Sequence, residues 1–318
     1  MIIEQLGRDT PAADGVTWQL QRGTVVHLTG NLYPQGSITI EAVGDGPPPV
    51  IQVPAEYQLA FMAKPGQTVR VHGVHIEGPL GGKPGSGWAV GKGGRFVGRD
   101  IAAAGFSNGV LISGDDSEVD GLAVWDVDTG IDGGRPDLPA PSRCRLERLH
   151  IRASSDAITL HDGTGTGRDN IIRSATLHAG RENGIDLQGM YAGTLVEDVV
   201  ISCPAGLYPA IWDGAGTTLR RVRIAAAQRP IYSRGAGATI HACDLGATAS
   251  PRTAALLAFA PGATGQIVHD CQGTVLPGSK RPALLAETGS GGVLRRLRVS
   301  NLSDMPTMGG DWAHWVLQ

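Results

Sequence analysis

Short strand-like runs recur along this chain at intervals of 20 to 27 residues. The first series of runs ends at Ile76, Ile101, Val124, Ile151, Leu177, Ile201, Ile224 and Leu245. Subtraction gives steps of 25, 23, 27, 26, 24, 23 and 21 residues. A sustained period of this kind is typical of a repeat architecture, in which each repeat buries its apolar face by stacking on its neighbours.

A second series of runs keeps the same irregular rhythm. Its anchors are Val110, Ile131, Ile158, Ile185, Ile211, Ile231 and Leu256, which step by 21, 27, 27, 26, 20 and 25 residues. Apolar and polar residues alternate within the runs, as in strands with one buried face. These steps are too short for a strand plus a crossover helix with its loops, and the Leu/Asn consensus of leucine-rich repeats is absent. The pattern predicts an all-β chain of stacked coils, each made of two or three short strands.

Composition fits many tight turns around a core of small aliphatic side chains. The chain has 47 Gly and 20 Pro against 4 Phe and 5 Tyr. Its net charge of −3 argues against a nucleic-acid partner, because phosphate binding needs a strongly basic face. The four cysteines lie far apart without a C-x-x-C pair, which predicts small buried thiols and neither a zinc site nor a disulfide framework.

The first residues, MIIEQLGRDT, lack the basic and apolar regions of a secretory signal. No apolar run approaches the length that a membrane crossing requires. We therefore expect no membrane insertion and no secretory signal in this chain.

The outward charges offer a test of the predicted stacking. Four residues before successive anchors of the first series lie Glu147, Arg173, Glu197 and Arg220, which alternate in sign. Opposite charges stabilise directly paired strands, whereas like charges destabilise them. Stacked coils should therefore bring these four residues together as ion pairs.

The clarity of the repeat divides the chain into three parts. Residues 1–66 repeat weakly and are expected to form an N-terminal cap and the first coils, and residues 67–300 the regular coils. Residues 301–318, with Trp312 and Trp315, are expected to cap the other end or to contact another subunit. Solenoids need such atypical ends to cover unpaired strand edges.

Runs such as SSDAITLHDG, NGIDLQG and PAIWDG look like the strands of the right-handed parallel β-helix superfamily, which is typified by pectate lyase and includes polygalacturonases, alginate epimerases and phage tailspikes. The resemblance covers roughly residues 15–300 and carries no catalytic signature. It implies a single right-handed parallel β-helix of about ten coils with capped ends. It also implies a binding surface along one outer sheet.

The residue after each second-series anchor should lie on such a surface. This column reads Leu111, Asp132, Thr159, Asp186, Trp212, Tyr232 and Leu257, and a neighbouring column includes His161, Gln188, Asp213 and Arg234. Carboxylates and guanidinium groups hydrogen-bond sugar hydroxyl and carboxyl groups, and aromatic faces stack on sugar rings. The predicted substrate-binding residues are accordingly Trp212, Tyr232, Arg234, Gln188 and Thr159.

Glycoside hydrolysis needs two carboxyl groups, about 5–5.5 Å apart for retention or about 6.5–9.5 Å apart for inversion. Asp186, Asp213 and Asp132 are the catalytic candidates, with His161 as a candidate base. Plain turn chemistry remains the alternative for Asp213, which precedes a glycine. No metal or cofactor is predicted, and calcium is left open without a motif. The adjacent Asp115 and Asp116 resemble the polygalacturonase pair only superficially, because its companion elements are missing.

Three functions follow as hypotheses. The first is a spike or fibre protein of a phage or phage-like particle, a homo-oligomer (a trimer by resemblance to tailspikes) that binds a cell-surface polysaccharide, with cleavage left open. A virion protein, released by lysis, would reconcile an extracellular partner with the lack of a signal. The second is a secreted polysaccharide lyase, glycoside hydrolase or epimerase. The third is a structural assembly spacer.

Overall fold

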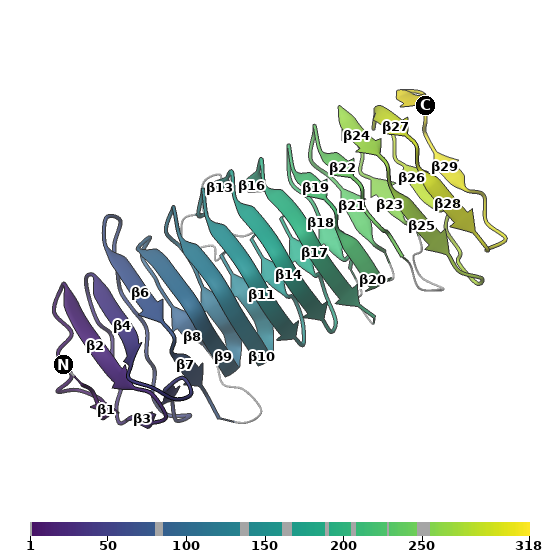
Figure 1. The fold of residues 1–318 in the computed structure, drawn as a ribbon. Helices are drawn as coiled ribbons and strands as arrows, with labels where there is room; N and C mark the ends of the chain where they lie inside the picture. Colours follow the sequence, from purple (N-terminus) through teal and green to yellow (C-terminus); the bar gives the residue numbers. More distant parts are fainter. Residues whose placement is uncertain are drawn as a thin grey trace.

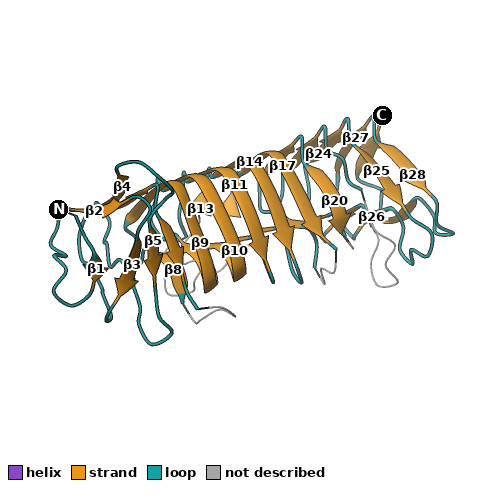
Figure 2. Cartoon of the chain, turned by 60° about the horizontal axis from the view of Figure 1, so that its bottom comes forward, coloured by secondary structure: helices purple, strands orange, loops and turns teal. Residues whose placement is uncertain are grey.

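The computed structural model is an elongated parallel β-solenoid of about 11 turns, here called rungs, wound as a right-handed parallel β-helix (Figure 1). It describes residues 2–79, 85–133, 140–160, 167–187, 191–204, 208–227, 229–246 and 255–318. Within these ranges there is no helix (Figure 2), and therefore none of the length and apolarity that a membrane crossing requires. The all-β, parallel β-helix prediction is confirmed.

Each rung crosses three faces, called sheets 1, 2 and 3 in chain order. Sheet 1 stacks β2 (Val16–Gln21), β4 (Ile38–Val43), β6 (Thr68–His72), the first parts of β9 (Arg95–Leu111), β10 (Glu118–Asp132), β11 (Arg145–Ala153), β14 (Ile171–Ala179) and β17 (Leu195–Cys203), then β19 (Thr218–Arg220), β22 (Thr239–His241), β24 (Gln266–His269), β27 (Gly292–Arg295) and β30 (Trp315–Leu317). All of these pairings are parallel.

Sheet 2 follows in the same rungs. It stacks β1 (Gln5–Leu6), β3 (Val25–Leu28), β5 (Val50–Gln52), β7 (His75–Glu77), the later parts of β9, β10, β11, β14 and β17, then β20 (Arg223–Ala227), with β25 (Gln272–Val275) and β28 (Arg298–Asn301) paired at its far end.

Sheet 3 completes each rung. It stacks β8 (Ser86–Ala89), the ends of β9 and β10, then β12 (Ile158–Thr159), β15 (Ile185–Asp186), β18 (Ile211–Trp212), β21 (Ile231–Ser233), β23 (Leu257–Phe259), β26 (Leu284–Ala286) and β29 (Met308–Gly310). β13 (Gly167–Arg168) and β16 (Tyr191–Ala192) form a short separate pair; β13 follows β12 in the chain and β16 follows β15.

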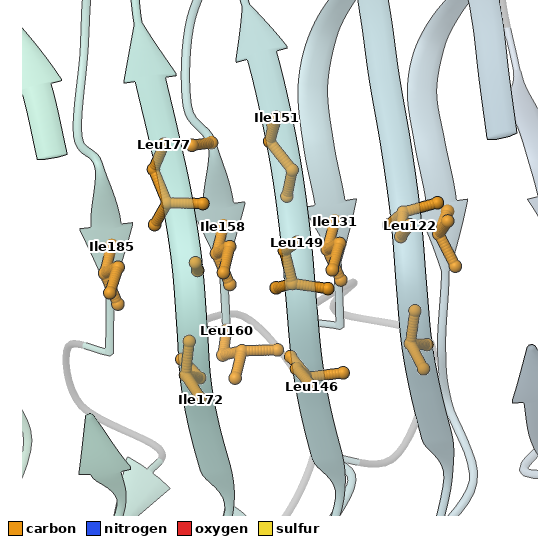
Figure 3. Close-up of a cluster of buried hydrophobic side chains, with 14 of the residues drawn as sticks. Leu122, Ile131, Leu146, Leu149, Ile151, Ile158, Leu160, Ile172, Leu177 and Ile185 are labelled. Atoms are coloured by element: carbon orange, nitrogen blue, oxygen red, sulfur yellow. The ribbon is translucent and has the colours of Figure 1, made fainter. Parts of the chain in front are cut away.

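The core consists of aliphatic columns that run along the solenoid. Ile131, Ile158 and Ile185 pair on consecutive rungs of sheet 3 and are fully buried, as Figure 3 shows. Leu122 and Leu149 pair in the same way on β10 and β11. Because alternate residues of each strand point inward, every outward position also lines up with its counterpart on the next rung.

The stacking confirms most of the predicted register and corrects it at two places. Ile231 pairs with Leu257 and not with Leu256. Because both adjacent residues are leucines, the sequence does not indicate which of them points inward. Ile76 pairs with Ala103, and Ile101 with Leu122, because left-handed residues such as Asp100 (φ 50°) interrupt the alternation at the corner between sheets 1 and 2.

The predicted charge column is confirmed. Glu147, Arg173, Glu197 and Arg220 occupy equivalent positions on consecutive rungs of sheet 1. Arg173 forms an ion pair with Glu147 at 2.6 Å, and Arg220 forms one with Glu197.

Two smaller predictions are settled by side-chain environments. The four cysteines are free and buried, as predicted. Asp115 and Asp116 both bind Arg143, so this pair has a structural role at a corner.

Strand pairing continues across residues 66 and 300, where β4 pairs with β6 and β27 with β30. Trp312 and Trp315 pack near Phe259 at the far end, with ring centroids 6.4 and 4.4 Å from its ring.

Candidate functional site

The predicted outward column of sheet 3 forms one continuous stack. Asp132 pairs with Thr159, Thr159 with Asp186, Asp186 with Trp212, and Trp212 with Tyr232. Each of these residues follows a fully buried isoleucine, so each points away from the core. The column then continues with Ala258, not with Leu257 as the sequence suggested. We call Asp132, Thr159, Asp186, Trp212 and Tyr232 the sheet 3 column.

The first half of the sheet 3 column is acidic. Asn108 donates a hydrogen bond of 3.1 Å to Oδ2 of the half-buried Asp132. Asp186 and Thr159 are only 4% and 8% exposed although they lie on the outward side of the strands. Asp132 and Asp186 are two rungs apart, which places their backbones about 10 Å from each other.

Thr159 lies between these two carboxylates. Its buried Oγ1 has no hydrogen-bond partner among the described residues. A buried hydroxyl without a partner costs free energy, so Thr159 is a candidate hydrogen-bonding residue of this site.

Two acidic residues that the sequence analysis did not select complete this half. Asp156 precedes β12 and Glu182 precedes β15, on adjacent rungs. The backbone N–H of Asn183 donates a hydrogen bond of 2.7 Å to Oδ1 of Asp156 and holds its carboxyl group in place. Asp156 also shares a side-chain hydrogen bond with Glu182.

Burial is the main cause that raises the pKa of Asp156, to about 7, and the hydrogen bond from Asn183 opposes this rise. The charge and hydrogen bond of Glu182 and the charge of Asp186 raise the pKa further. Asp156 therefore retains a proton close to neutral pH, which an ordinary aspartic acid does not. Carboxyl groups that keep a proton at this pH are suited to general acid catalysis.

The second half of the column is aromatic and basic. The rings of Trp212 and Tyr232 meet edge to face with centroids 5.6 Å apart, and Tyr208 stacks on Trp212 at 6.4 Å. The guanidinium of Arg234 lies 5.5 Å from the Trp212 ring centroid, and that of Arg229 lies 5.2 Å from the Tyr232 centroid. This half offers flat apolar faces beside hydrogen-bond donors.

Asp213 does not belong to this surface. It is fully buried, and its Oδ1 accepts hydrogen bonds from the backbone N–H groups of Arg234 at 2.8 Å and Gly235 at 3.2 Å. Strand alternation is the reason: Ile211 points inward, Trp212 outward and Asp213 inward again. The predicted outward position of Asp213 beside Trp212 is therefore wrong. The observed inward position suits a structural cap better than a catalytic role.

Of the remaining predicted site residues, one lies on the surface and two lie outside the described residues. Arg234 is exposed beside Trp212, whereas His161 and Gln188 lie outside the described residues. Asp156 and Glu182 were missed because they precede the repeat anchors by two and three residues, where no strand alternation points to the surface.

No protein-family model and no curated protein matches the sequence. Solved structures do match the fold. The catalytic unit of the thermostable GH87 alpha-1,3-glucanase from Streptomyces thermodiastaticus strain HF3-3 superposes with a TM-score of 0.57 at 14% identity, over 96% of this chain and 65% of that one. The Agl-KA catalytic domain gives a TM-score of 0.54 at 12% identity, over 95% of this chain and 62% of that domain.

The chain thus spans slightly less than two thirds of each of these catalytic units. Mutants of the periplasmic alginate epimerase AlgG also match, with TM-scores of 0.29 and 0.32, values too low to compare the folds in detail. At these identities the likeness shows the architecture, a right-handed parallel β-helix.

Proposed function

We propose that this chain binds a polysaccharide along sheet 3 and hydrolyses it at the acidic half of the sheet 3 column. One observation carries the proposal: the carboxyl groups of Asp132 and Asp186 and an aromatic, guanidinium-flanked surface lie on consecutive rungs of the same column. The alpha-1,3-glucanase unit that shares the fold is named for activity on a polysaccharide, which supports this class of substrate.

The aromatic half is suited to holding the polymer. The faces of Trp212, Tyr208 and Tyr232 can pack against the apolar faces of sugar rings, and Arg229 and Arg234 can donate hydrogen bonds to sugar oxygens. Successive rungs about 4.8 Å apart repeat these contacts along the direction of a bound chain.

The acidic half is suited to the chemistry. Asp132 and Asp186 flank Thr159 with backbones about 10 Å apart. This separation is closer to the wider of the two carboxyl arrangements, about 6.5–9.5 Å, in which a water molecule attacks with inversion. We assign Asp186, which is 4% exposed and lies beside the Asp156–Glu182 pair that retains a proton near neutral pH, as the proton donor. Asp132 lies across the gap as the base that activates water.

A product assay tests this function. The full chain is incubated with neutral glucans, alginate, pectic polymers and bacterial capsular polysaccharides, and new reducing ends are measured. We expect reducing ends from at least one polymer and their loss in Asp186→Asn. Asp169→Asn is the matched control, because Asp169 is exposed and left-handed (φ 58°), a conformation that asparagine tolerates. Absence of product from the whole panel, or full activity in Asp186→Asn, would refute hydrolysis at this site.

A virion location and a trimeric spike stay predictions from the sequence. Both depend on partners, so gene order around the coding sequence and sedimentation of the purified chain are the measurements that check them. Flanking tail or capsid genes and a stable trimer are the expected results for a spike.

A further inference from the structure

The outward column of sheet 1 changes character near its C-terminal end. It contains Glu41, His72, Arg99, Asp120, Glu147, Arg173, Glu197, Arg220, His241, His269 and Arg295 on consecutive rungs. From Glu147 to Arg220 opposite charges alternate. The next two rungs bring two imidazoles into register, which ion-pair alternation does not explain.

These imidazoles belong to His241 on β22 and His269 on β24. Their ring centroids are 4.1 Å apart and their planes differ by 14°. Asp270 follows His269 directly and has a left-handed backbone (φ 57°). Its Oδ2 lies 3.0 Å from Nδ1 of His269 and 3.9 Å from Nε2 of His241.

One nitrogen from each ring therefore lies near the same carboxylate oxygen. These ligand atoms lie within 4.8 Å of one another. The side chains of His241, His269 and Asp270 are 37%, 28% and 35% exposed, so an ion can reach them from solvent.

We propose that His241 Nε2, His269 Nδ1 and Asp270 Oδ2 bind a divalent transition-metal ion such as Zn²⁺ or Ni²⁺, with water completing the coordination. Two nitrogens and one oxygen suit these ions, whereas Ca²⁺ and Mg²⁺ prefer oxygen ligands throughout. Zn–N bonds of about 2.0–2.1 Å put two ligand atoms of a tetrahedral ion about 3.3 Å apart. Partly exposed side chains on neighbouring rungs can close to this spacing by small rotations.

Arg296 sets the affinity of this site. Its Nε donates to Oδ1 of Asp270 at 2.6 Å and its Nη2 to Oδ2 at 2.7 Å. The second bond occupies the oxygen that the ion needs, and the guanidinium charge repels a cation. The Arg296 side chain is 72% exposed, so it can withdraw from Oδ2 and retain Oδ1. Removal of Arg296 should therefore strengthen metal binding, an effect opposite to removal of a ligand.

Isothermal titration of the full chain with ZnCl₂ and, separately, NiCl₂ tests the site. We expect one ion per chain, at least tenfold weaker binding in His269→Ala, His241→Ala and Asp270→Asn, and tighter binding in Arg296→Gln. His150→Ala is the matched control, because His150 is exposed on sheet 2 and far along the solenoid. Circular dichroism verifies that each variant keeps its β structure.

The absence of any heat of binding at millimolar metal would overturn the site. The same is true if His150→Ala weakens binding as much as His269→Ala, or if Asp270→Asn and Arg296→Gln leave the affinity unchanged. Because His241 and His269 lie on sheet 1, these outcomes leave the proposed hydrolysis on sheet 3 unaffected.

Discussion

Sheet 1 and sheet 3 share the same rung spacing but use their outward positions differently. On sheet 1, Glu147 and Glu197 each contact an arginine on a neighbouring rung, so stacking satisfies their charges. On sheet 3, Asp132 and Asp186 flank a buried hydroxyl that has no partner among the described residues. The first arrangement stabilises the fold.

The second arrangement costs stability, and such costs concentrate at functional sites. A β-helix brings equivalent residues of successive rungs together on every face. The face on which that proximity gathers carboxyl groups, a buried hydroxyl and aromatic rings is the candidate for function. The following four predictions separate the two faces.

The largest expected difference concerns two carboxylates of the same strand, β10. Asp132→Asn should lower polysaccharide turnover about 10²- to 10⁴-fold, the usual contribution of a general acid or base, with little change in thermal stability. Asp120→Asn, on sheet 1, should keep turnover and lower the melting temperature, because Asp120 accepts a hydrogen bond of 2.5 Å from Arg148. Equal turnover in the two variants would contradict a catalytic column on sheet 3.

The next largest effect is on stability alone. The Glu197 side chain is 5% exposed and contacts both Arg220 and Arg221. Glu197→Gln removes a buried charge from this network and should lower the free energy of unfolding in urea by about 2–3 kcal/mol. Asp115→Asn, at a 52% exposed ion pair, should change it by less than about 1 kcal/mol. If both variants lose the same free energy of unfolding, burial does not make the sheet 1 network more stabilising than an exposed ion pair.

A smaller effect distinguishes two partly exposed tryptophans. Trp212→Ala should weaken oligosaccharide binding about tenfold, which corresponds to the loss of about 1.4 kcal/mol of ring stacking. Trp125→Ala removes a 41% exposed indole from sheet 2 and should leave the affinity unchanged. Titration followed by tryptophan fluorescence or calorimetry measures both, and equal losses would remove the aromatic half of the proposed surface.

The smallest predicted effect concerns how stability depends on pH, which should have opposite signs for Asp213 and Asp198. Burial raises the pKa of Asp213 to about 6, so the stability from this group is complete below about pH 4 and is lost as the pH rises through 6. The hydrogen bond from Arg221 lowers the pKa of Asp198, so its stability is present above pH 4 and is lost as the pH falls. At pH 7, Asp213→Asn should therefore raise the melting temperature and Asp198→Asn should lower it. Shifts of the same sign would contradict these assignments.

The sequence predicts the stacking well because it depends on residue spacing. From Val110 to Ile231 every predicted anchor of sheet 3 pairs with the next, and the column from Asp132 to Tyr232 follows from strand alternation alone. Alternation also indicates that Asp213, the residue after the outward Trp212, points inward, where its Oδ1 accepts a hydrogen bond from the backbone of Arg234. Prediction is weaker where alternation ends.

The acidic half illustrates the same limit. Asp156 and Glu182 come together through the turns that precede β12 and β15, where the hydrogen bond from Asn183 orients the Asp156 carboxyl group. The His241 and His269 pair had a signal that could have been read: each is followed two residues later by a cysteine, in the runs HAC and HDC, 28 residues apart.

The most direct test is a crystal structure of Asp186→Asn with an oligosaccharide of the polymer that binds most tightly. We predict sugar rings across the sheet 3 column, with one ring face against Trp212 and a glycosidic oxygen between Asp132 and residue 186. Sugar bound on sheet 1 or sheet 2, with the sheet 3 column free of carbohydrate, would contradict the proposed function.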